Sequence, residues 1–335
     1  IRQYRPRIEG SFSRIERIYK KDQDTYYWCV TSKENITTFF GYSESCRIAD
    51  PKDGKKVFQW LPEFSFDDKG SWVWYEYKKE DLETVTNELH EKNRFDGIAL
   101  FSSKHLKFIK YGNEKAKYFD INPYDPTLPQ DENYFFTLVF DYGEHDKDAP
   151  KLNDNAPWIP RKDAFSSCRS GFEMRTYRLC QRVLMFHTFP NDGENNLLNN
   201  GEPTLVRSLD FSYTHSNEEV EEIEDFKKKI TACEVTYLSS ITQTGYIKTG
   251  NTYSKKSLPT MTFDYQKLRW NKKAADITAE NLVHAPIGLS NGVQWVDLYN
   301  EGISGILTEQ ANAWFYKSNL GNGAFSNAQL VMPKP

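Results

Sequence analysis

The stretch FSFDDKGSWVWYEYK, residues 64–78, indicates the fold class of this chain. Two runs rich in aromatic residues, which favour pleated strands, flank the polar segment Asp67–Gly70. Glycine adopts positive φ without steric cost, so Gly70 can close a tight turn between the two runs. The stretch therefore predicts an antiparallel β-hairpin. Its Trp72, Trp74 and Tyr77 could form a sugar-stacking face, but we favour their packing within the sheet.

The rest of the sequence has the same β-rich character. The 335 residues include 20 Tyr, 22 Phe and 8 Trp, side chains that sheets accommodate well. Apolar alternations separated by turn residues recur at 12–19, 104–113 and 132–146, and again in three similar units at 204–215, 236–248 and 257–268. Residues 158–171 are typical of a loop. We expect an all-β, mainly antiparallel protein with one or two short helices.

Charge and hydropathy argue against several functions. Lys and Arg total 43 against 47 Asp and Glu, a net charge of −4, so there is no basic excess for nucleic acid or an anionic membrane. No apolar run approaches the roughly 18 residues of a membrane-spanning helix. No signal peptide is visible, and an initial Ile1 suggests a fragment of a longer chain.

Two segments raise the choice between helix and strand. KEDLETVTNELHEKN, residues 79–93, carries one narrow apolar stripe, which predicts a helix with His90 at its boundary. GFEMRTYRLCQRVLMFHTF, residues 171–189, fits both periodicities. Its flanking Gly and Pro favour a strand. The side chains expected on one face of that strand are Tyr177, Leu179, Val183 and Met185.

The cysteines do not form a metal-binding or disulfide pattern. The five residues are scattered, without a C-x-x-C pair, and we interpret them as buried thiols. They are Cys29, Cys46, Cys168, Cys180 and Cys233.

Candidate acid–base and anion-binding groups are few. Glu144-His145-Asp146 follows a predicted strand, and we expect a solvated hairpin end more than a metal or acid–base site. Arg178, Arg182 and His187 lack a Gly-rich loop beside them, so cross-strand ion pairs are the preferred interpretation over an anion site.

Two further motifs are short. Glu219-Val220-Glu221 and Glu222-Ile223-Glu224 match the E-x-E pattern of ADP-ribosyltransferases, but no Ser-Thr-Ser strand follows the upstream Arg207. They are better explained as part of an acidic, solvated run. Asn35-Ile36-Thr37 is a glycosylation sequon that is meaningful only in a eukaryotic secretory pathway.

The segment DLYNEG, beginning at Asp297, has the spacing of a calcium loop, D-x-[DN]-x-[DN]-G. Tyr299 and Glu301 replace short oxygen ligands, and Gly305 falls where a closing Asp would be. We predict that Gly302 and Gly305 shape tight bends here without a metal.

Many long segments together resemble one family, the B component of insecticidal toxin complexes (Tc toxins, TcdB/TcaC type) and the related N-terminal region of the virulence protein SpvB. The matching segments occur in the family's order over nearly the whole chain. They include YRPRIEGSFSRIERI, SKENITTFFGYSESCRIADP, FSSCRSGFEMRTYRLCQRVLMFHTFP, LVRSLDFSY, LSSITQTGY and GISGILTEQANAWFYKSNLGNGAF. An Asn-rich insertion at 191–203 and the acidic run at 217–225 depart from the family pattern.

The resemblance implies an architecture of SpvB-type and Rhs-shell-like sheets that lead into the first blade of a VCBS/FG-GAP-like β-propeller. The expected domains are 1–112, the C-terminal part of an SpvB-type domain; 113–290, a β-rich shell region; and 291–335, an incomplete propeller.

The resemblance also implies a noncatalytic, secreted virulence protein that helps to enclose a toxin. Its implied partners are the C component of the shell and the pore-forming A component. We predict no catalytic, cofactor-binding or metal-binding residues and no cofactor, no binding of nucleic acid, and no direct insertion into a membrane. The alternative is a segment of an SpvB-like actin ADP-ribosyltransferase whose catalytic domain lies elsewhere.

Overall fold

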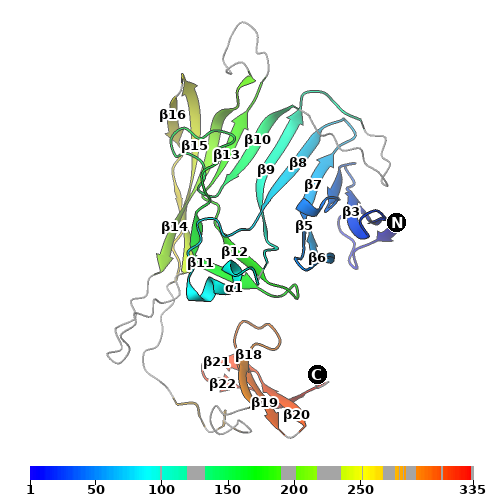
Figure 1. Cartoon of the computed structure of the whole chain (residues 1–335), viewed down its shortest axis with the longest axis vertical. Helices are drawn as coiled ribbons and strands as arrows, with labels where there is room; N and C mark the ends of the chain where they lie inside the picture. The colour runs from blue at the N-terminus through cyan, green and yellow to red at the C-terminus, as the bar shows by residue number, and fades with distance from the viewer. Residues whose placement is uncertain are drawn as a thin grey trace. The chain divides into compact units, whose positions relative to one another are not determined.

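The computed structural model describes residues 1–98, 100–118, 133–189, 201–216, 235–250, 252–266, 276–278, 280–281, 283, 292–310 and 312–332. The chain divides into two compact units, Ile1–Tyr265 and Gln266–Pro335 (Figure 1). Within the described residues, no helix has the length and apolar character needed to cross a membrane.

A 13-stranded antiparallel sheet forms the first unit. Its strand order is β1-β2-β3-β4-β7-β8-β9-β10-β13-β14-β15-β16, and β17 also pairs with β15. The strands are β1 Arg2–Tyr4, β2 Arg14–Lys20, β3 Thr25–Thr31, β4 Thr37–Phe40, β7 Pro62–Phe66, β8 Trp72–Lys79, β9 Lys104–Asn113, β10 Tyr134–Asp141, β13 Arg182–His187, β14 Thr204–Ser216, β15 Val235–Thr249, β16 Thr252–Ser257 and β17 Met261–Thr262. The all-β, mainly antiparallel fold predicted from the sequence is confirmed.

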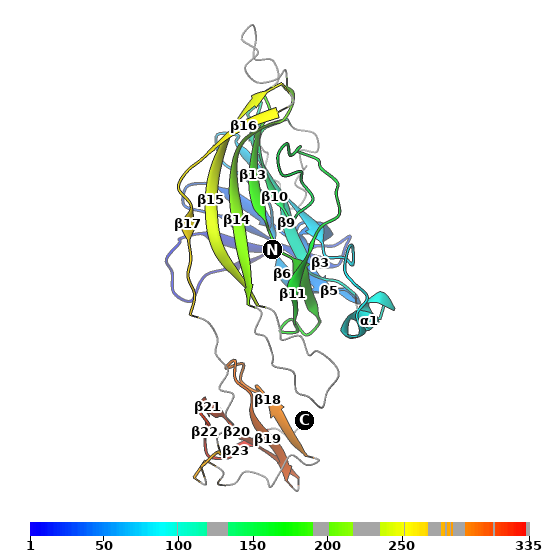
Figure 2. The same ribbon diagram turned by 90° about the vertical axis from the view of Figure 1, so that its left-hand side faces the viewer.

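Two hairpins and short helical turns interrupt the path of this sheet. The hairpins are β5 Arg47–Asp50 with β6 Asp53–Trp60, and β11 Pro160–Ser167 with β12 Met174–Arg178. The helical turns are η1 Glu44–Cys46, η2 Leu89–Glu91 and α1 Lys92–Phe95. Figures 1 and 2 show both hairpins and α1 on the same side of this unit.

The predicted hairpin at 64–78 is confirmed, since β7 pairs with β8 in antiparallel register. Asp67 closes its turn by accepting backbone N–H bonds at Oδ1 from Lys69 (3.0 Å) and Ser71 (2.8 Å). Gly70 has φ +85°, and a Cβ at this position would lie 2.8 Å from the backbone nitrogen of Lys117. Glycine is therefore required here by both the turn and the close approach of a second segment.

Aromatic and aliphatic side chains from alternate strand positions form two cores. The first contains Ile18, Tyr27, Cys29, Phe39, Phe64, Phe66 and Trp72. The second contains Val139, Leu184, Phe186 and Leu205. Trp72 is only 2% exposed, so its side chain packs in the core as predicted and offers no surface for stacking a sugar.

The helix predicted over 79–93 is wrong for most of its length. Only Leu89–Glu91 and Lys92–Phe95 are helical, and Leu89 is 86% exposed. The competing interaction is tertiary: buried Glu80 bonds to side chains of β9 and β12, which holds the chain after β8 in an extended path. A weak helical propensity does not outweigh such contacts.

Residues 171–189 form strands as predicted, but in two separate pieces. Leu179–Gln181 leave the strand, so β12 pairs with β11 whereas β13 joins the large sheet. This break shifts the alternation, and the core receives Leu184 and Phe186 instead of Val183 and Met185. The loop expected at 158–171 is also wrong, because β11 lies there.

The three predicted strand units have different outcomes. The first two correspond to β14 and β15. Within the described residues, the third contributes β17 Met261–Thr262 and its first residue, Ser257, which ends β16 Thr252–Ser257.

The second unit contains a four-stranded antiparallel sheet in the order β18-β19-β20-β23. Its strands are β18 Val293–Val296, β19 Gly305–Gln310, β20 Ala313–Lys317 and β23 Gln329–Val331, with a smaller hairpin of β21 Asn319–Gly321 and β22 Ala324–Phe325. The large sheet of the first unit continues across residue 112, since β9 pairs with both β8 and β10. The expected boundaries after residues 112 and 290 remain predictions.

Candidate functional site

The segment Glu144-His145-Asp146 was expected at a solvated hairpin end, but the structure buries most of it. Glu144 is 2% exposed and His145 is 5% exposed, and both lie beside Asp141, which is 1% exposed. The carboxylate and imidazole donor atoms of these three residues all lie within 4.8 Å of one another. We call them, with Lys107 and Arg182, the Asp141 cluster.

Lys107 of β9 supplies the first positive charge in the Asp141 cluster. Its ammonium donates to a carboxylate oxygen of Glu144 and to Nε2 of His145 at 2.9 Å. The opposite nitrogen of this ring, Nδ1, lies 2.8 Å from the carbonyl oxygen of Lys151, so Nδ1 carries the proton and Nε2 accepts. Burial and the charge of Lys107 lower the pKa of His145, which keeps the ring neutral.

Arg182 supplies the second positive charge and fixes the loop after β10. It lies directly opposite Asp141 in the β10–β13 register and donates from Nε to Oδ2 at 2.6 Å. It also donates to three loop carbonyls, at Lys147 (3.2 Å), His145 (3.0 Å) and Asp146 (2.9 Å). Burial alone would raise the pKa of Asp141, but the charge of Arg182 and the N–H of Gly143 outweigh it and lower that pKa.

The Asp141 cluster has the side chains of a metal site but not the electrostatics of one. Lys107 donates hydrogen bonds to Glu144 and His145, two of the three candidate ligands. Arg182 donates a hydrogen bond to Asp141, the third candidate ligand. A divalent cation would therefore have to displace two side-chain cations from a buried position. The arrangement fits a neutralised ion-pair network better than metal coordination.

A second buried group, the Glu80 cluster, joins the segment after β8 to β9 and β12. Glu80 accepts from Nε of Arg178 at 3.0 Å, from Nε2 of His105 at 2.8 Å and from the backbone N–H of Tyr177 at 2.8 Å. Burial raises the pKa of Glu80, but these hydrogen bonds and the Arg178 charge outweigh it, so the pKa is lowered. The carboxylate therefore remains ionised within the fold.

Arg178 connects this cluster to two loops. It donates to the carbonyl oxygens of Trp158 (3.0 Å) and Glu83 (3.0 Å), and to Asp81 at both its carbonyl (3.1 Å) and its carboxylate (2.5 Å). The Trp158 ring in turn stacks on Tyr142, with centroids 4.5 Å apart. Through these contacts the Arg178 guanidinium holds the loops after β8 and β10 in place.

A third group, the Glu91 cluster, anchors the helical turn that precedes α1. Glu91 is 3% exposed and accepts from Arg94 Nη1 at 2.6 Å, and also from Arg175 and the Tyr177 hydroxyl. Burial and the bond to Glu91 raise the pKa of Tyr177 to about 12. The three clusters contain carboxylates, two histidines and a tyrosine, and these groups are buried or partly buried and hydrogen-bonded within the fold.

The predicted cross-strand ion pair is confirmed for Arg182, which pairs with Asp141 across β10 and β13. Arg178 pairs instead with Glu80 and Asp81 of the segment that follows β8. His187 stands apart on β13, packed edge-to-face against Phe136 at 4.9 Å. Burial and the charge of Arg207 lower the pKa of His187. The structure therefore does not assemble an anion site from these three residues.

The calcium-like loop is closed by backbone hydrogen bonds. Asp297 accepts at Oδ1 from the N–H of Glu301 and at Oδ2 from the N–H of Gly302, both at 2.7 Å. Gly302 has positive φ, as a tight bend requires, but Gly305 does not lie in a bend. It begins β19, where an added Cβ would meet Lys317 O at 2.4 Å and Tyr316 Oη at 2.5 Å.

The remaining sequence candidates have mixed outcomes. Asn35 lies in an exposed turn at φ 60°. The E-x-E pairs Glu219-Val220-Glu221 and Glu222-Ile223-Glu224, and also Cys233, lie outside the described residues, as do most of the Asn-rich and acidic insertions. Cys29 and Cys46 are buried thiols as expected, whereas Cys168 is exposed, contrary to expectation.

Sequence reasoning missed Glu80, Glu91 and Lys107 as network members. Each lies in a segment with several other charged residues, so local pattern does not mark it as the buried one. The partners lie 98 residues away for Glu80–Arg178 and 37 for Lys107–Glu144. Only the pairing of the strands brings them together.

Comparison with known proteins identifies the family of this chain. Residues 1–189 match the family model SpvB, described as Salmonella virulence plasmid 65kDa B protein. The Mono(ADP-ribosyl)transferases SpvB of Salmonella typhimurium and Salmonella choleraesuis are each 33% identical over 195 residues. This alignment covers 57% of the present chain and 32% of each relative, so the chain spans about a third of their length.

Solved structures give the same relationship. A Photorhabdus luminescens Tc holotoxin pore structure matches 99% of this chain and 15% of its own, with a TM-score of 0.64 at 27% identity. A structure of the N-terminal domain of the effector SpvB from Salmonella typhimurium matches 70% of this chain and 68% of its own, with a TM-score of 0.54 at 28% identity. The chain thus belongs to the SpvB family.

Proposed function

We propose that this chain is a noncatalytic structural segment of a secreted toxin of the SpvB and Tc B-component type. The observation that carries the proposal is the state of its ionisable groups. The conspicuous acid–base residues of the first unit are buried in the three clusters, where each carboxylate is matched by Arg, Lys or His. Such groups hold loops on a sheet and have no access to a substrate.

Within this proposal, the 13-stranded sheet forms part of the wall of a shell around a toxic cargo. The residues from 291 onward form the first blade of a β-propeller, and this is supported by the four-stranded antiparallel order β18-β19-β20-β23. The partners are a C component that completes the shell and a pore-forming A component on which the propeller docks. The likeness to a chain of a Tc holotoxin pore over 99% of the present residues supports these roles.

Assembly tests this function. The parent protein that contains this chain, co-expressed with its C component, should form a closed particle by electron microscopy and should protect an enclosed C-terminal segment from protease. It should also bind the A component in pull-down. A parent protein that forms no particle and binds neither component would disprove the structural role.

The alternative is a role within an ADP-ribosyltransferase toxin whose catalytic domain lies outside this segment, which is supported by the name of the Salmonella relatives. Incubation of this chain with NAD and actin should give no transfer. Transfer that is lost in Glu219→Gln and Glu221→Gln would contradict the noncatalytic proposal and would make the E-x-E run catalytic.

A further inference from the structure

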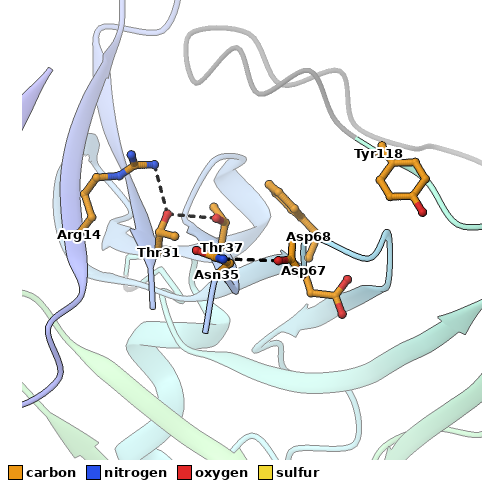
Figure 3. A pocket seen from close by; sticks show the side chains of 8 residues that line it. Arg14, Thr31, Asn35, Thr37, Asp67, Asp68 and Tyr118 are labelled. Carbon is orange, nitrogen blue, oxygen red and sulfur yellow. Dashed lines mark hydrogen bonds between the residues drawn. The ribbon is translucent and has the colours of Figure 1, made fainter. Parts of the chain in front are cut away.

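A cavity of about 380 Å³ opens among the ends of β2, β3, β4 and β7. Its size lies at the lower end of the roughly 300–1,000 Å³ that small-molecule pockets occupy. Figure 3 shows Arg14 on one side of the opening and Tyr118 on the far side, with Thr31, Thr37, Asn35 and the Asp67–Asp68 turn between them. It lies apart from the three buried clusters, which involve none of these residues.

Hydrogen bonds hold the backbone turns that line this pocket. Asn35 belongs to a turn closed by the backbone bonds Ser32 N–H to Ile36 O (2.9 Å) and Asn35 N–H to Ser32 O (3.1 Å). The Asp67 turn is capped by its own carboxylate. The backbone next to Tyr118 is held by Lys117, whose N–H donates to Gly70 O at 3.1 Å. A preorganised pocket binds its ligand with little ordering cost.

The polar groups facing this space include both donors and acceptors. Among the described residues, the Arg14 side chain makes only long bonds, with Thr31 Oγ1 (3.5 Å) and Glu16 (3.3 Å), so it retains donor capacity. The hydroxyls of Thr31 and Thr37 lie 3.0 Å apart and share one hydrogen between them, which leaves one hydroxyl hydrogen to donate.

Acceptors lie across the pocket from the guanidinium. The amide of Asn35 reaches Asp68 Oδ2 at 3.4 Å, and this is the one bond that the Asp68 side chain makes within the described part of the chain. The side-chain carbonyl oxygen of Asn35 also has no hydrogen-bond partner among the described residues.

The mixture of charges selects the class of ligand. A simple anion would face Asp67 and Asp68, and a simple cation would face Arg14. A neutral ligand whose groups both donate and accept satisfies both sides, and hydroxyl groups have this property. The Tyr118 ring is 73% exposed and offers an apolar face next to these polar groups. We propose that this pocket binds a saccharide, with Asp68, Asn35 and Arg14 on its hydroxyls and Tyr118 against its C–H face.

Saturation-transfer NMR on the full chain tests this proposal with glucose, galactose, mannose and N-acetylglucosamine as probes. At least one sugar should receive saturation from the protein. Asp68→Asn and Tyr118→Ala should each weaken its binding at least about tenfold, the scale expected for a lost charged hydrogen bond or ring contact. Asp96→Asn, at another exposed acidic position outside the pocket, should bind like wild type.

Three results would overturn the assignment. One is the absence of saturation transfer to all four sugars. Another is a bound sugar whose affinity is the same in wild type, Asp68→Asn and Tyr118→Ala. Displacement of a bound sugar by lysine or inorganic phosphate at equal concentration would also contradict it, because an ionic ligand would then be preferred. Unchanged thermal unfolding of both variants ensures that a loss of binding is local, as expected for surface positions.

Discussion

Arg178 and Glu80 form an ion pair of 3.0 Å although 98 residues separate them in the chain. Their side chains are 1% and 0% exposed. The pair joins the end of β12 to the segment that follows β8, so it connects two excursions from the large sheet. Because the pair is buried, its two members are strongly coupled, and the loss of Arg178 removes the guanidinium that offsets the charge of Glu80.

Replacement of Arg178 by Met should destabilise the first unit by about 3–5 kcal/mol, the range for an uncompensated buried charge. The variant leaves the Glu80 carboxylate buried and frees the carbonyls of Trp158 and Glu83. Urea unfolding followed by tryptophan fluorescence measures this loss. Arg169→Met, at an exposed position, should change stability by no more than about 0.5 kcal/mol.

The double variant Arg178→Met with Glu80→Gln provides the second half of this test. It should be more stable than the sum of the two single losses predicts, because no charge is left unpaired. Strict additivity would show that the pair is not coupled.

Stability should fall as the pH is lowered from 7 to 5. The pKa of His145 in the folded chain lies below its ordinary value of 6.5, so the unfolded chain takes up a proton first and is favoured as the pH passes below 6.5. The lowered pKa of His187 likewise reduces the stability of the folded chain as the pH falls. At lower pH the depressed pKa values of Glu80 and Asp141 add a further loss, beginning near their ordinary values of 4.5 and 3.8.

His145→Gln should reduce the slope of unfolding free energy against pH by up to about 1.4 kcal/mol per pH unit just below pH 6.5. Denaturant titrations at several pH values measure this slope. His90→Gln, whose parent side chain is 72% exposed, should leave it unchanged. An identical slope in the two variants would contradict the role assigned to His145.

Gly305→Ala should destabilise β19 and β20, since its Cβ would meet the Lys317 carbonyl oxygen at 2.4 Å. Overpacking of this kind costs roughly 1–3 kcal/mol, with the upper end expected here because one atom met is backbone. Hydrogen–deuterium exchange of 305–317 measures the effect. Gly54→Ala, where an added Cβ would have open space, should leave exchange in its own strand β6 unaltered or slower.

Asp297→Ala should open the loop between β18 and β19, because two backbone N–H groups lose their acceptor. The cost is about 0.5–1.5 kcal/mol for each hydrogen bond. Calcium addition or chelation should not shift the unfolding temperature of wild type. A calcium-dependent rise that disappears in Asp297→Ala would instead identify a metal site.

Cys168 should be the fast-reacting thiol among the four cysteines whose surroundings are described. It is exposed, whereas burial raises the pKa of Cys29, Cys46 and Cys180 to about 12. Iodoacetamide at pH 8 followed by peptide mapping should label Cys168 within minutes and the other three only after unfolding. Rapid native labelling of Cys29 or Cys46 would contradict the burial of that thiol.

The strands were largely predictable, because the alternation of apolar and polar residues and the turn residues that produce them are local features of the sequence. Alternation in 104–113 and the Asp67–Gly70 turn gave β9 and the β7–β8 hairpin directly. The prediction of a helix over 79–93 is wrong, because a buried tertiary ion pair at Glu80 outweighs the local helix propensity. The prediction of which side chains of β13 are buried is wrong, because a short break at Leu179–Gln181 reverses the two-residue alternation. No local pattern marks such a break.

The buried charged clusters were likewise predictable only in part. Arg178 and Arg182 lie in the family-like segment FSSCRSGFEMRTYRLCQRVLMFHTFP, but their partners Glu80 and Asp141 lie in other parts of the sequence. The sequence by itself determined that this chain forms antiparallel strands and belongs among the SpvB and Tc-type proteins, since both depend on local order of residues. Only the tertiary structure decided which charges are buried and paired, because the electrostatic cost of burial is offset by partners that strand pairing brings from distant parts of the chain.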